Sequence, residues 1–182
     1  MRKTENKPNS PIDAPNVDEE LLVLERLTDL FYSKDAQGKN ASHIIWHIIR
    51  LARHSEQIIE YSVHRPLGWS WAGFRIMINL VALGPVEPSK LAAVLGVSRP
   101  TITSTLNKLE RGKYVRREKD PENGRRILVH LTKHGHQLVM QAVPEQQAVE
   151  KKLVATLSRK ERAMLADMLN RLLVGMKEDD RI

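Results

Sequence analysis

The spacing of apolar residues predicts a chain built mainly from amphipathic helices. Apolar side chains recur every three to four residues in several stretches, which is the spacing of one buried helix face. These stretches are residues 18–33, 42–64, 70–83, 132–157 and 158–176. The last one carries an apolar stripe two residues wide, which either the first helices of the chain or a second subunit must cover. The helix over 18–33 either adds to the core of its own subunit or packs across a partner.

Two short helices joined by a tight turn are predicted between Leu91 and Gly112. Gly96 follows the last apolar position of the first helix, where a residue that tolerates positive φ closes a helix. Ser98 can cap the second helix, and Pro100 stands in its first turn, where a missing N–H is not needed. The polar face of the second helix consists of Arg99, Thr101, Thr103, Ser104, Asn107 and Lys108. These side chains can bind phosphates and base edges, which predicts a helix-turn-helix whose second helix enters a DNA major groove.

A β-hairpin is predicted directly after this second helix. Residues 114–119 and 126–131 alternate between apolar and polar positions, and the loop between them is rich in turn-forming residues. A basic hairpin that follows a recognition helix is typical of a wing. Arg125 and Arg126 at its tip, together with Lys113 at its base, are expected to contact phosphates or the neighbouring minor groove.

The formal net charge of +7 falls on the same segment. Residues 88–133 hold 11 Lys and Arg against 4 Asp and Glu, whereas the remainder of the chain holds 18 of each. Most charge runs are only solvated faces, but here the sign, the location and the motif agree. The segment is therefore expected to bind a polyanion, with double-stranded DNA as the leading candidate.

Composition excludes several other classes of protein. The chain has no cysteine, which excludes disulfides and thiolate metal sites. It shows neither a membrane-spanning apolar run nor the apolar core of a signal peptide, so we expect a cytoplasmic protein that does not bind membranes. No phosphate-binding glycine loop, nucleophile elbow or metalloprotease helix is present, and we expect neither enzymatic activity nor a cofactor.

The wing carries the most specific family motif. Its sequence from Asp120 to Thr132, DPENGRRILVHLT, resembles the Asp-Pro, Arg-Arg and Leu-Thr pattern of the MarR family of bacterial winged-helix transcriptional regulators. Residues 91–101 are similar to the same family, and the likeness extends over about residues 42–176. It implies a homodimer on an inverted-repeat operator, and an Asp120 side chain that stabilises the wing by pairing with Arg125. Many members of the family release DNA when a small, often aromatic, anion binds.

Candidate ligand-binding residues surround the predicted junction between the dimerisation and DNA-binding regions. Aromatic walls beside cationic side chains would suit a planar anion. The candidates are Trp46, His47, Arg50, Trp69, Trp71 and Arg75. The alternative is that the tryptophans pack the junction and the cations face water. No metal site is expected: His43 and His47 have ligand spacing, and His130, His134 and His136 lie close together, but no cysteine or well-spaced carboxylate completes either set.

The sequence thus predicts a mainly α-helical fold with a small β-hairpin wing, a winged helix-turn-helix flanked by dimerisation helices. We expect a disordered tail over 1–17, N-terminal dimerisation helices over 18–65, the DNA-binding domain over 66–132 and C-terminal dimerisation helices over 133–182. The favoured function is a dimeric, sequence-specific repressor that a small aromatic anion releases from DNA. The alternatives are an architectural DNA-binding protein and a protein-interaction winged helix.

Overall fold

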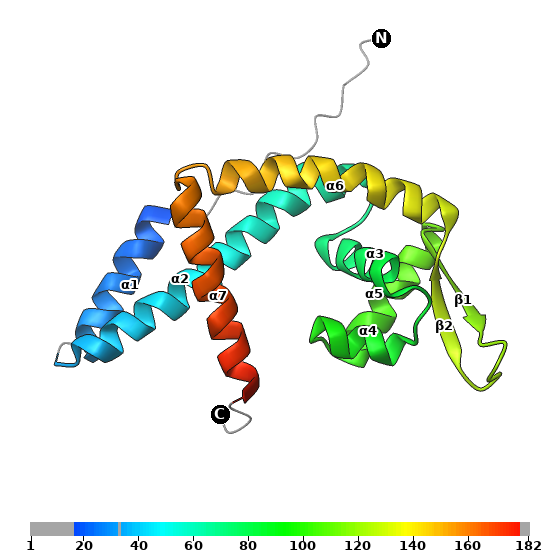
Figure 1. Ribbon diagram of the computed structural model, residues 1–182, viewed down its shortest axis with the longest axis horizontal. Helices are drawn as coiled ribbons and strands as arrows, with labels where there is room; N and C mark the ends of the chain where they lie inside the picture. The colour runs from blue at the N-terminus through cyan, green and yellow to red at the C-terminus, as the bar shows by residue number, and fades with distance from the viewer. Residues whose placement is uncertain (1–16, 33, 179–182) are drawn as a thin grey trace, which may run out of the picture. The chain divides into compact units, whose positions relative to one another are not determined.

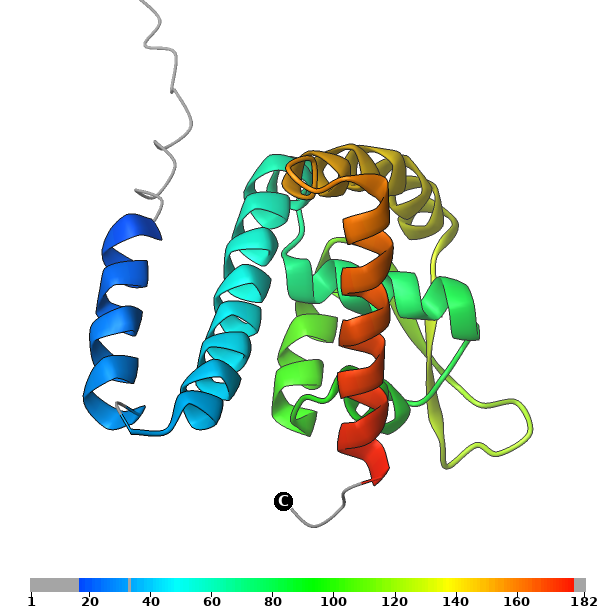
Figure 2. The ribbon, with the colours of Figure 1, turned by 60° about the vertical axis from the view of Figure 1, so that its left-hand side comes forward.

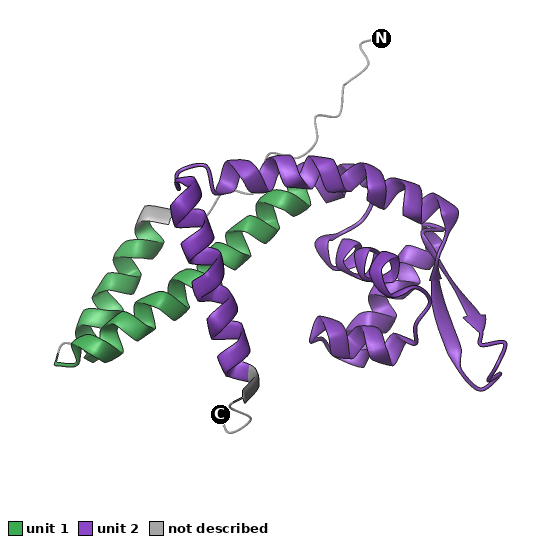
Figure 3. Cartoon of the chain, viewed as in Figure 1, with its two compact units in different colours: residues 1–61 green, residues 62–182 purple. Residues whose placement is uncertain are grey.

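The computed structural model describes residues 17–32 and 34–178 (Figure 1). The chain divides into two compact units, residues 1–61 and 62–182 (Figure 3). The tail expected over 1–17 lies outside the described residues except for Val17, the first residue of α1. None of the described helices is both long enough and apolar enough to span a membrane.

The first unit is a helical hairpin formed by α1 (Val17–Tyr32) and α2 (Ala36–Ile59) (Figure 2). α2 begins six residues before the predicted start because the Asp35 side chain accepts a hydrogen bond from the Gly38 N–H and caps the helix. Thr28 is buried on α1, and its hydroxyl lies 2.7 Å from His43 Nε2 on α2.

An ion-pair cluster also joins α1 to α2. The Glu20 carboxylate lies 3.0 Å from Arg50, 3.1 Å from Arg53 and 3.3 Å from His54. The hydrogen bond from His54, followed by the charges of Arg50 and Arg53, lowers the pKa of Glu20 despite its partial burial. The first unit is therefore held together by polar contacts, while many of its apolar side chains stay exposed.

The second unit has the element order of a winged helix followed by two helices. A π-helical segment, Glu60–His64, and a 3-10 turn, Arg65–Leu67, lead from α2 into it. Its helices and strands are α3 (Trp71–Leu83), α4 (Pro88–Leu95), α5 (Arg99–Arg111), β1 (Val115–Lys119), β2 (Ile127–Leu131), α6 (Lys133–Leu153) and α7 (Arg159–Glu178). The predicted helix-turn-helix and β-hairpin are thereby confirmed.

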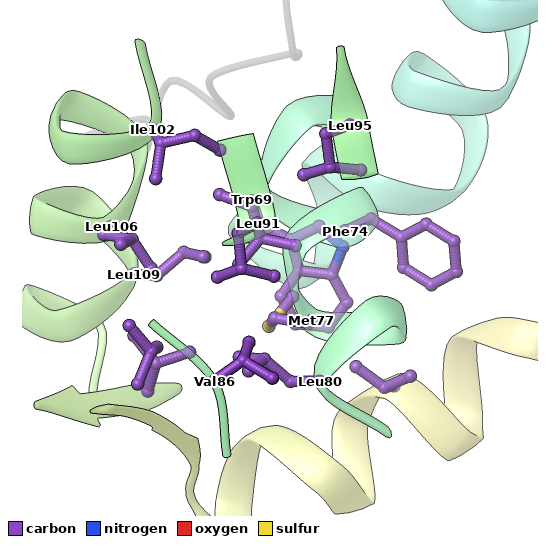
Figure 4. Packing of buried hydrophobic residues seen from close by; sticks show 14 of the residues in the cluster. Trp69, Phe74, Met77, Leu80, Val86, Leu91, Leu95, Ile102, Leu106 and Leu109 are labelled. Atoms are coloured by element: carbon purple, nitrogen blue, oxygen red, sulfur yellow. The ribbon is translucent and has the colours of Figure 1, made fainter. Parts of the chain in front are cut away.

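The core of the second unit lies where α3, α4 and α5 meet the base of the hairpin (Figure 4). Met77, Leu91 and Leu106 are completely buried there. Val86, between α3 and α4, pairs with Val129 of β2 as an isolated antiparallel bridge and joins the hairpin to the helices. β1 and β2 pair in register from Val115↔Leu131 to Lys119↔Ile127. These contacts fix the position of the wing relative to α5.

The two C-terminal helices differ in how much of their surface is covered. α6 packs against α3 and buries Val139 and Ala142 in the core. The first half of α6 therefore packs with the predicted DNA-binding domain, which the sequence predicts to end at residue 132. It continues through Pro144 and ends at Leu153, four residues before the predicted end. A capping box starts α7, since the Ser158 N–H donates to Glu161 Oε2 at 2.7 Å and the Glu161 N–H donates to Ser158 Oγ at 3.3 Å. The apolar stripe of α7 is exposed: Met164, Leu165, Met168, Leu172, Leu173 and Met176.

Candidate nucleic-acid interface

The recognition helix, α5, separates its buried and exposed faces as the sequence predicts. Ile102, Leu106 and Leu109 are buried against the core. Gly96 closes α4 with φ of 64°, a left-handed conformation that favours glycine. Ser98 caps α5 by accepting a hydrogen bond from the Thr101 N–H at 3.3 Å. These local features present the opposite face of α5 to solvent.

The structure places all of the predicted α5 residues on the exposed side of the helix. They form the recognition face: Ser98, Arg99, Pro100, Thr101, Thr103, Ser104, Asn107 and Lys108. The Thr103 hydroxyl donates to the Arg99 carbonyl at 3.0 Å, so its oxygen retains a lone pair for an outside donor. This face therefore offers both donors and acceptors, together with the positive charges of Arg99 and Lys108.

A contact between the wing and α5 involves Asn107, a predicted residue, together with Arg117 and Glu110, for which the sequence gives no signal. Arg117 of β1 donates from both terminal nitrogens to Asn107 Oδ1, at 2.8 and 2.9 Å. It also pairs with Glu110 at 3.1 Å, which offsets the one carboxylate of α5. The positions are ten and seven residues apart on different elements, so periodicity gives no signal for this contact.

The wing tip carries contacts that the sequence did not predict. Among the ion pairs of the described wing residues, none joins Asp120 to Arg125, and the pairing implied by the family resemblance stays a prediction. Instead, Asp120 Oδ1 accepts from the Glu122 N–H at 2.9 Å and holds the turn, which satisfies the carboxylate without an arginine. Arg126 pairs with Glu87 at 3.2 Å, and Arg125 is left exposed at the tip.

The base of the wing is fixed by Thr132 and the turn after α5. Thr132 Oγ1 lies 2.8 Å from the Lys113 carbonyl and 3.0 Å from the Tyr114 carbonyl, and it accepts from the Gly135 N–H at 2.9 Å. Thr132 is thus the N-cap of α6. Lys113, also predicted as a phosphate contact, is exposed and has φ of 59°, which is uncommon for a residue with a side chain.

Three of the candidate ligand residues lie in the second unit, and each has a structural partner. Trp69 is buried, and its indole N–H donates to His64 Nδ1 at 3.1 Å. At a distance of 3.1 Å, Arg75 donates a hydrogen bond to the carbonyl of Leu95, which is the last residue of α4. Trp71 stacks on Phe74 with ring centroids 6.0 Å apart. These contacts agree with a packing role for the tryptophans and for Arg75.

The other three candidates, Trp46, His47 and Arg50, lie on α2 in the first unit. Trp46 and Arg50 line an open pocket of about 430 Å³ with Val23, Ile49 and Arg53. Glu19 and Glu20 line it as well, so its cations face carboxylates. His47 is exposed and bonds to the His43 carbonyl through Nδ1. This pocket is poorly suited to an anion because Glu20 already neutralises Arg50.

A second pocket, of about 400 Å³, lies beside the recognition helix within the second unit. Its cationic side chains are Arg65 and Lys108, and its aromatic side chains are Trp69 and Tyr114. The remaining lining residues are Gly68, Ser70, Gly73, Thr105 and Leu109. Ser70 caps the N-terminus of α3 at its edge, where the helix dipole favours a negative charge. Unlike the pocket on α2, it has no carboxylate in its lining.

The histidines that drew attention in the sequence have contacts with other side chains. His43 bonds to Thr28, His130 lies 3.5 Å from Glu118, and His134 stacks on Tyr114. Within the described residues, no group of three or more His, Asp or Glu side chains is arranged to hold a metal ion.

Comparison with known proteins identifies regulators of transcription. Residues 69–127 match the model of the MarR family. The chain is 26% identical over 132 residues to the uncharacterized HTH-type transcriptional regulator YwaE of Bacillus subtilis, a match that covers 72% of this chain and 77% of that protein. It is 28% identical over 88 residues to the transcriptional repressor MprA of Escherichia coli, spanning 48% of this chain and half the length of MprA.

Solved structures show the same fold. A mutant MarR of Escherichia coli complexed with operator DNA matches with a TM-score of 0.67 and 24% identity, covering 80% of this chain and 99% of that chain. Bordetella bronchiseptica BpsR, whose DNA binding is regulated by 6-hydroxynicotinic acid, matches with a TM-score of 0.64 and 19% identity. This match covers 71% of this chain and 98% of the BpsR chain. At these identities the likeness establishes the winged-helix fold.

Proposed function

We propose that the chain, whose residues 69–127 match the model of the MarR family, is a member of that family and acts as a homodimeric, sequence-specific repressor. It binds an inverted-repeat operator in double-stranded DNA, with α5 in the major groove and the wing beside it. A small aromatic anion releases it. MprA, a relative, is a transcriptional repressor, which supports this direction of control.

The observation that carries the DNA-binding proposal is the separation of faces on α5. Its apolar face is buried, and its exposed face presents hydroxyl, amide and cationic groups beside a basic wing. A non-specific binder needs phosphate contacts, but it has no need for amide and hydroxyl groups at the centre of the helix. Side chains such as Ser104 and Asn107 are suited to base edges, and this favours specific over architectural binding.

The apolar surface of α7 supports the proposed dimer. Its stripe includes Leu172 at 45% and Met176 at 72% exposure in the single chain. Burying such a stripe stabilises a protein by about 25 cal/mol of free energy for each Å² of apolar surface. A monomer does not gain this stabilisation because its stripe stays in contact with water. A symmetric partner can cover the stripe with its own copy, and it brings two recognition helices to one DNA duplex.

The pocket between Arg65 and Lys108 is the candidate site for the aromatic anion, because Lys108 lies on the recognition face. Its two cations can bind a carboxylate, and the Trp69 and Tyr114 rings provide apolar walls. Lys108 also belongs to the recognition face, so a bound anion would neutralise a charge that DNA requires. The regulation of BpsR by 6-hydroxynicotinic acid supports this class of ligand.

A competition gel shift tests the DNA-binding proposal. Labelled DNA from upstream of the protein's own gene is titrated against that same DNA and against a shuffled duplex of equal composition. We expect at least a hundredfold preference for the upstream DNA, within the usual range of specificity for regulators. Equal competition by both duplexes would indicate an architectural role, and no binding to either would indicate a protein-interaction domain.

Arg65→Gln tests the ligand pocket separately from DNA binding. Arg65 lines the pocket but does not belong to the recognition face, so we expect this variant to bind DNA like the wild type. It should need roughly tenfold more aromatic carboxylate for release, since one charged hydrogen bond is lost. Arg50→Gln is the matched control in the pocket on α2. If Arg50→Gln rather than Arg65→Gln raises the concentration of aromatic carboxylate needed to release DNA, the assignment of the pocket is wrong.

A further inference from the structure

A side chain of the wing determines which end of the Asn107 amide faces the solvent. Both terminal nitrogens of Arg117 donate to Asn107 Oδ1, at 2.8 and 2.9 Å. A guanidinium group has donors and no acceptor, so the atom that faces it must be the amide oxygen. The NH₂ group of Asn107 therefore lies on the other side of the amide, on an exposed position of α5.

Arg117 is itself held by three further contacts. Its Nη1 atom donates to Glu110 Oε2 at 3.1 Å, and its backbone N–H donates to Glu110 Oε1 at the same distance. Arg117 is also paired with Val129 in the hairpin register, and its side chain is only 26% exposed. The arginine is thus oriented by the wing and by α5 before DNA arrives, and Asn107 is oriented with it.

We infer that Arg117 makes Asn107 a donor-only reader of one base in each half-site, an inference that rests on the proposed DNA-binding function. An unrestrained asparagine recognises adenine by donating to N7 and accepting from the N6 amino group. With Oδ1 occupied by Arg117, the accepting half of that pair is lost. The NH₂ group then donates to both O6 and N7 of guanine, whereas adenine offers it N7 alone. A hollow of about 490 Å³ beside Asn107, Glu110 and Arg111 leaves room for the base.

A purely structural role for Arg117 predicts a different outcome. Arg117 also offsets the negative charge of Glu110, so its loss would weaken binding to every DNA sequence to a similar degree. The base preference at the position read by Asn107 separates the orienting role of Arg117 from the purely structural one. A general electrostatic loss weakens binding but does not change this base preference.

Selection from a random duplex pool, with the full chain, tests the inference. The position read by Asn107 is the one whose preference disappears in Asn107→Ala. There we expect the wild type to favour guanine, which offers two acceptors, over adenine, which offers one, by roughly fivefold, the worth of one hydrogen bond. Arg117→Met should raise adenine to at least equal preference. Glu110→Gln is the control: it removes the charge but keeps a side-chain oxygen for Arg117, so the wild-type preference should persist.

A second measurement needs no variant and therefore does not depend on how Arg117→Met folds. The wild-type protein is titrated with duplexes in which the selected guanine is replaced by 7-deazaguanine. This change removes the N7 acceptor, and we expect roughly fivefold weaker binding. Selection of adenine by the wild type, unchanged preference in Arg117→Met, or no affected position in Asn107→Ala would each overturn the inference. If the wild type enriches no sequence at all, the proposed function fails with it.

Discussion

Replacing Gly135 by alanine tests how tightly the wing is seated on α6. Gly135 is buried in the first turn of α6, directly beside the start of the hairpin. A Cβ atom at this position would overlap the backbone carbonyl oxygen of Tyr114 and lie 3.0 Å from Leu131 Cδ1. Because the carbonyl belongs to the backbone, it can move only if the turn before β1 moves with it.

The expected cost follows from the contacts that such a movement would disturb. Overpacking a filled site costs about 1–3 kcal/mol. The Tyr114 carbonyl also accepts from Thr132, so the cap of α6 weakens and adds about 1 kcal/mol. Alanine recovers up to about 1 kcal/mol of helix propensity. The net loss is about 2 kcal/mol, which for a chain of 182 residues lowers the melting temperature by about 4–8 °C.

Thermal unfolding followed by circular dichroism measures this change. Gly175→Ala is the matched control, because Gly175 is also helical but a Cβ there meets nothing within 4 Å. We expect Gly175→Ala to melt at or above the wild-type temperature and Gly135→Ala to melt several degrees below it. A Gly135→Ala protein that melts with the wild type would refute the packing described for the base of the wing.

Three further predictions concern the wing, α7 and the first unit. Arg125→Ala should weaken binding to all DNA sequences alike and reduce the slope of log K against log salt by about one unit; an unchanged slope would remove Arg125 from the DNA contacts. Truncation after Ser158 should yield monomers or aggregates in sedimentation, whereas a stable dimer would show that α7 is not the interface. The lowered pKa of Glu20 means that the ionised carboxylate stabilises the fold above its ordinary pKa of 4.5. The difference in melting temperature between wild type and Glu20→Gln should therefore be full at neutral pH and shrink as the pH falls below 4.5; a constant difference would contradict the ion-pair cluster.

Much of the fold could be predicted because its signals are local in the sequence. Ser98, Thr132 and the Ser158–Glu161 box each mark a helix start, and all three cap helices in the structure. Gly96 marks the end of α4 for a similar reason. The start of α2 was missed because Asp35, its cap, precedes a polar stretch with no apolar periodicity.

The interactions between elements could not be predicted in the same way. The bonds from Arg117 to Asn107 depend on how β1 lies against α5, which spacing along the chain does not encode. Asp120 accepts from a neighbouring N–H, because the turn itself supplies a donor at 2.9 Å. The six candidate ligand residues share aromatic or cationic side chains, but three of them lie in the first unit and three in the second. The pocket beside Lys108 contains only Trp69 of that set.

Hydroxyl-radical footprinting of the full chain on its upstream DNA tests most directly whether two α5 faces read successive major grooves. We predict two protected patches on one side of the duplex, centred about one helical turn apart, and their loss in the double variant Ser104→Ala, Asn107→Ala. A single patch, or even protection along the whole duplex that the double variant leaves unchanged, would contradict the account.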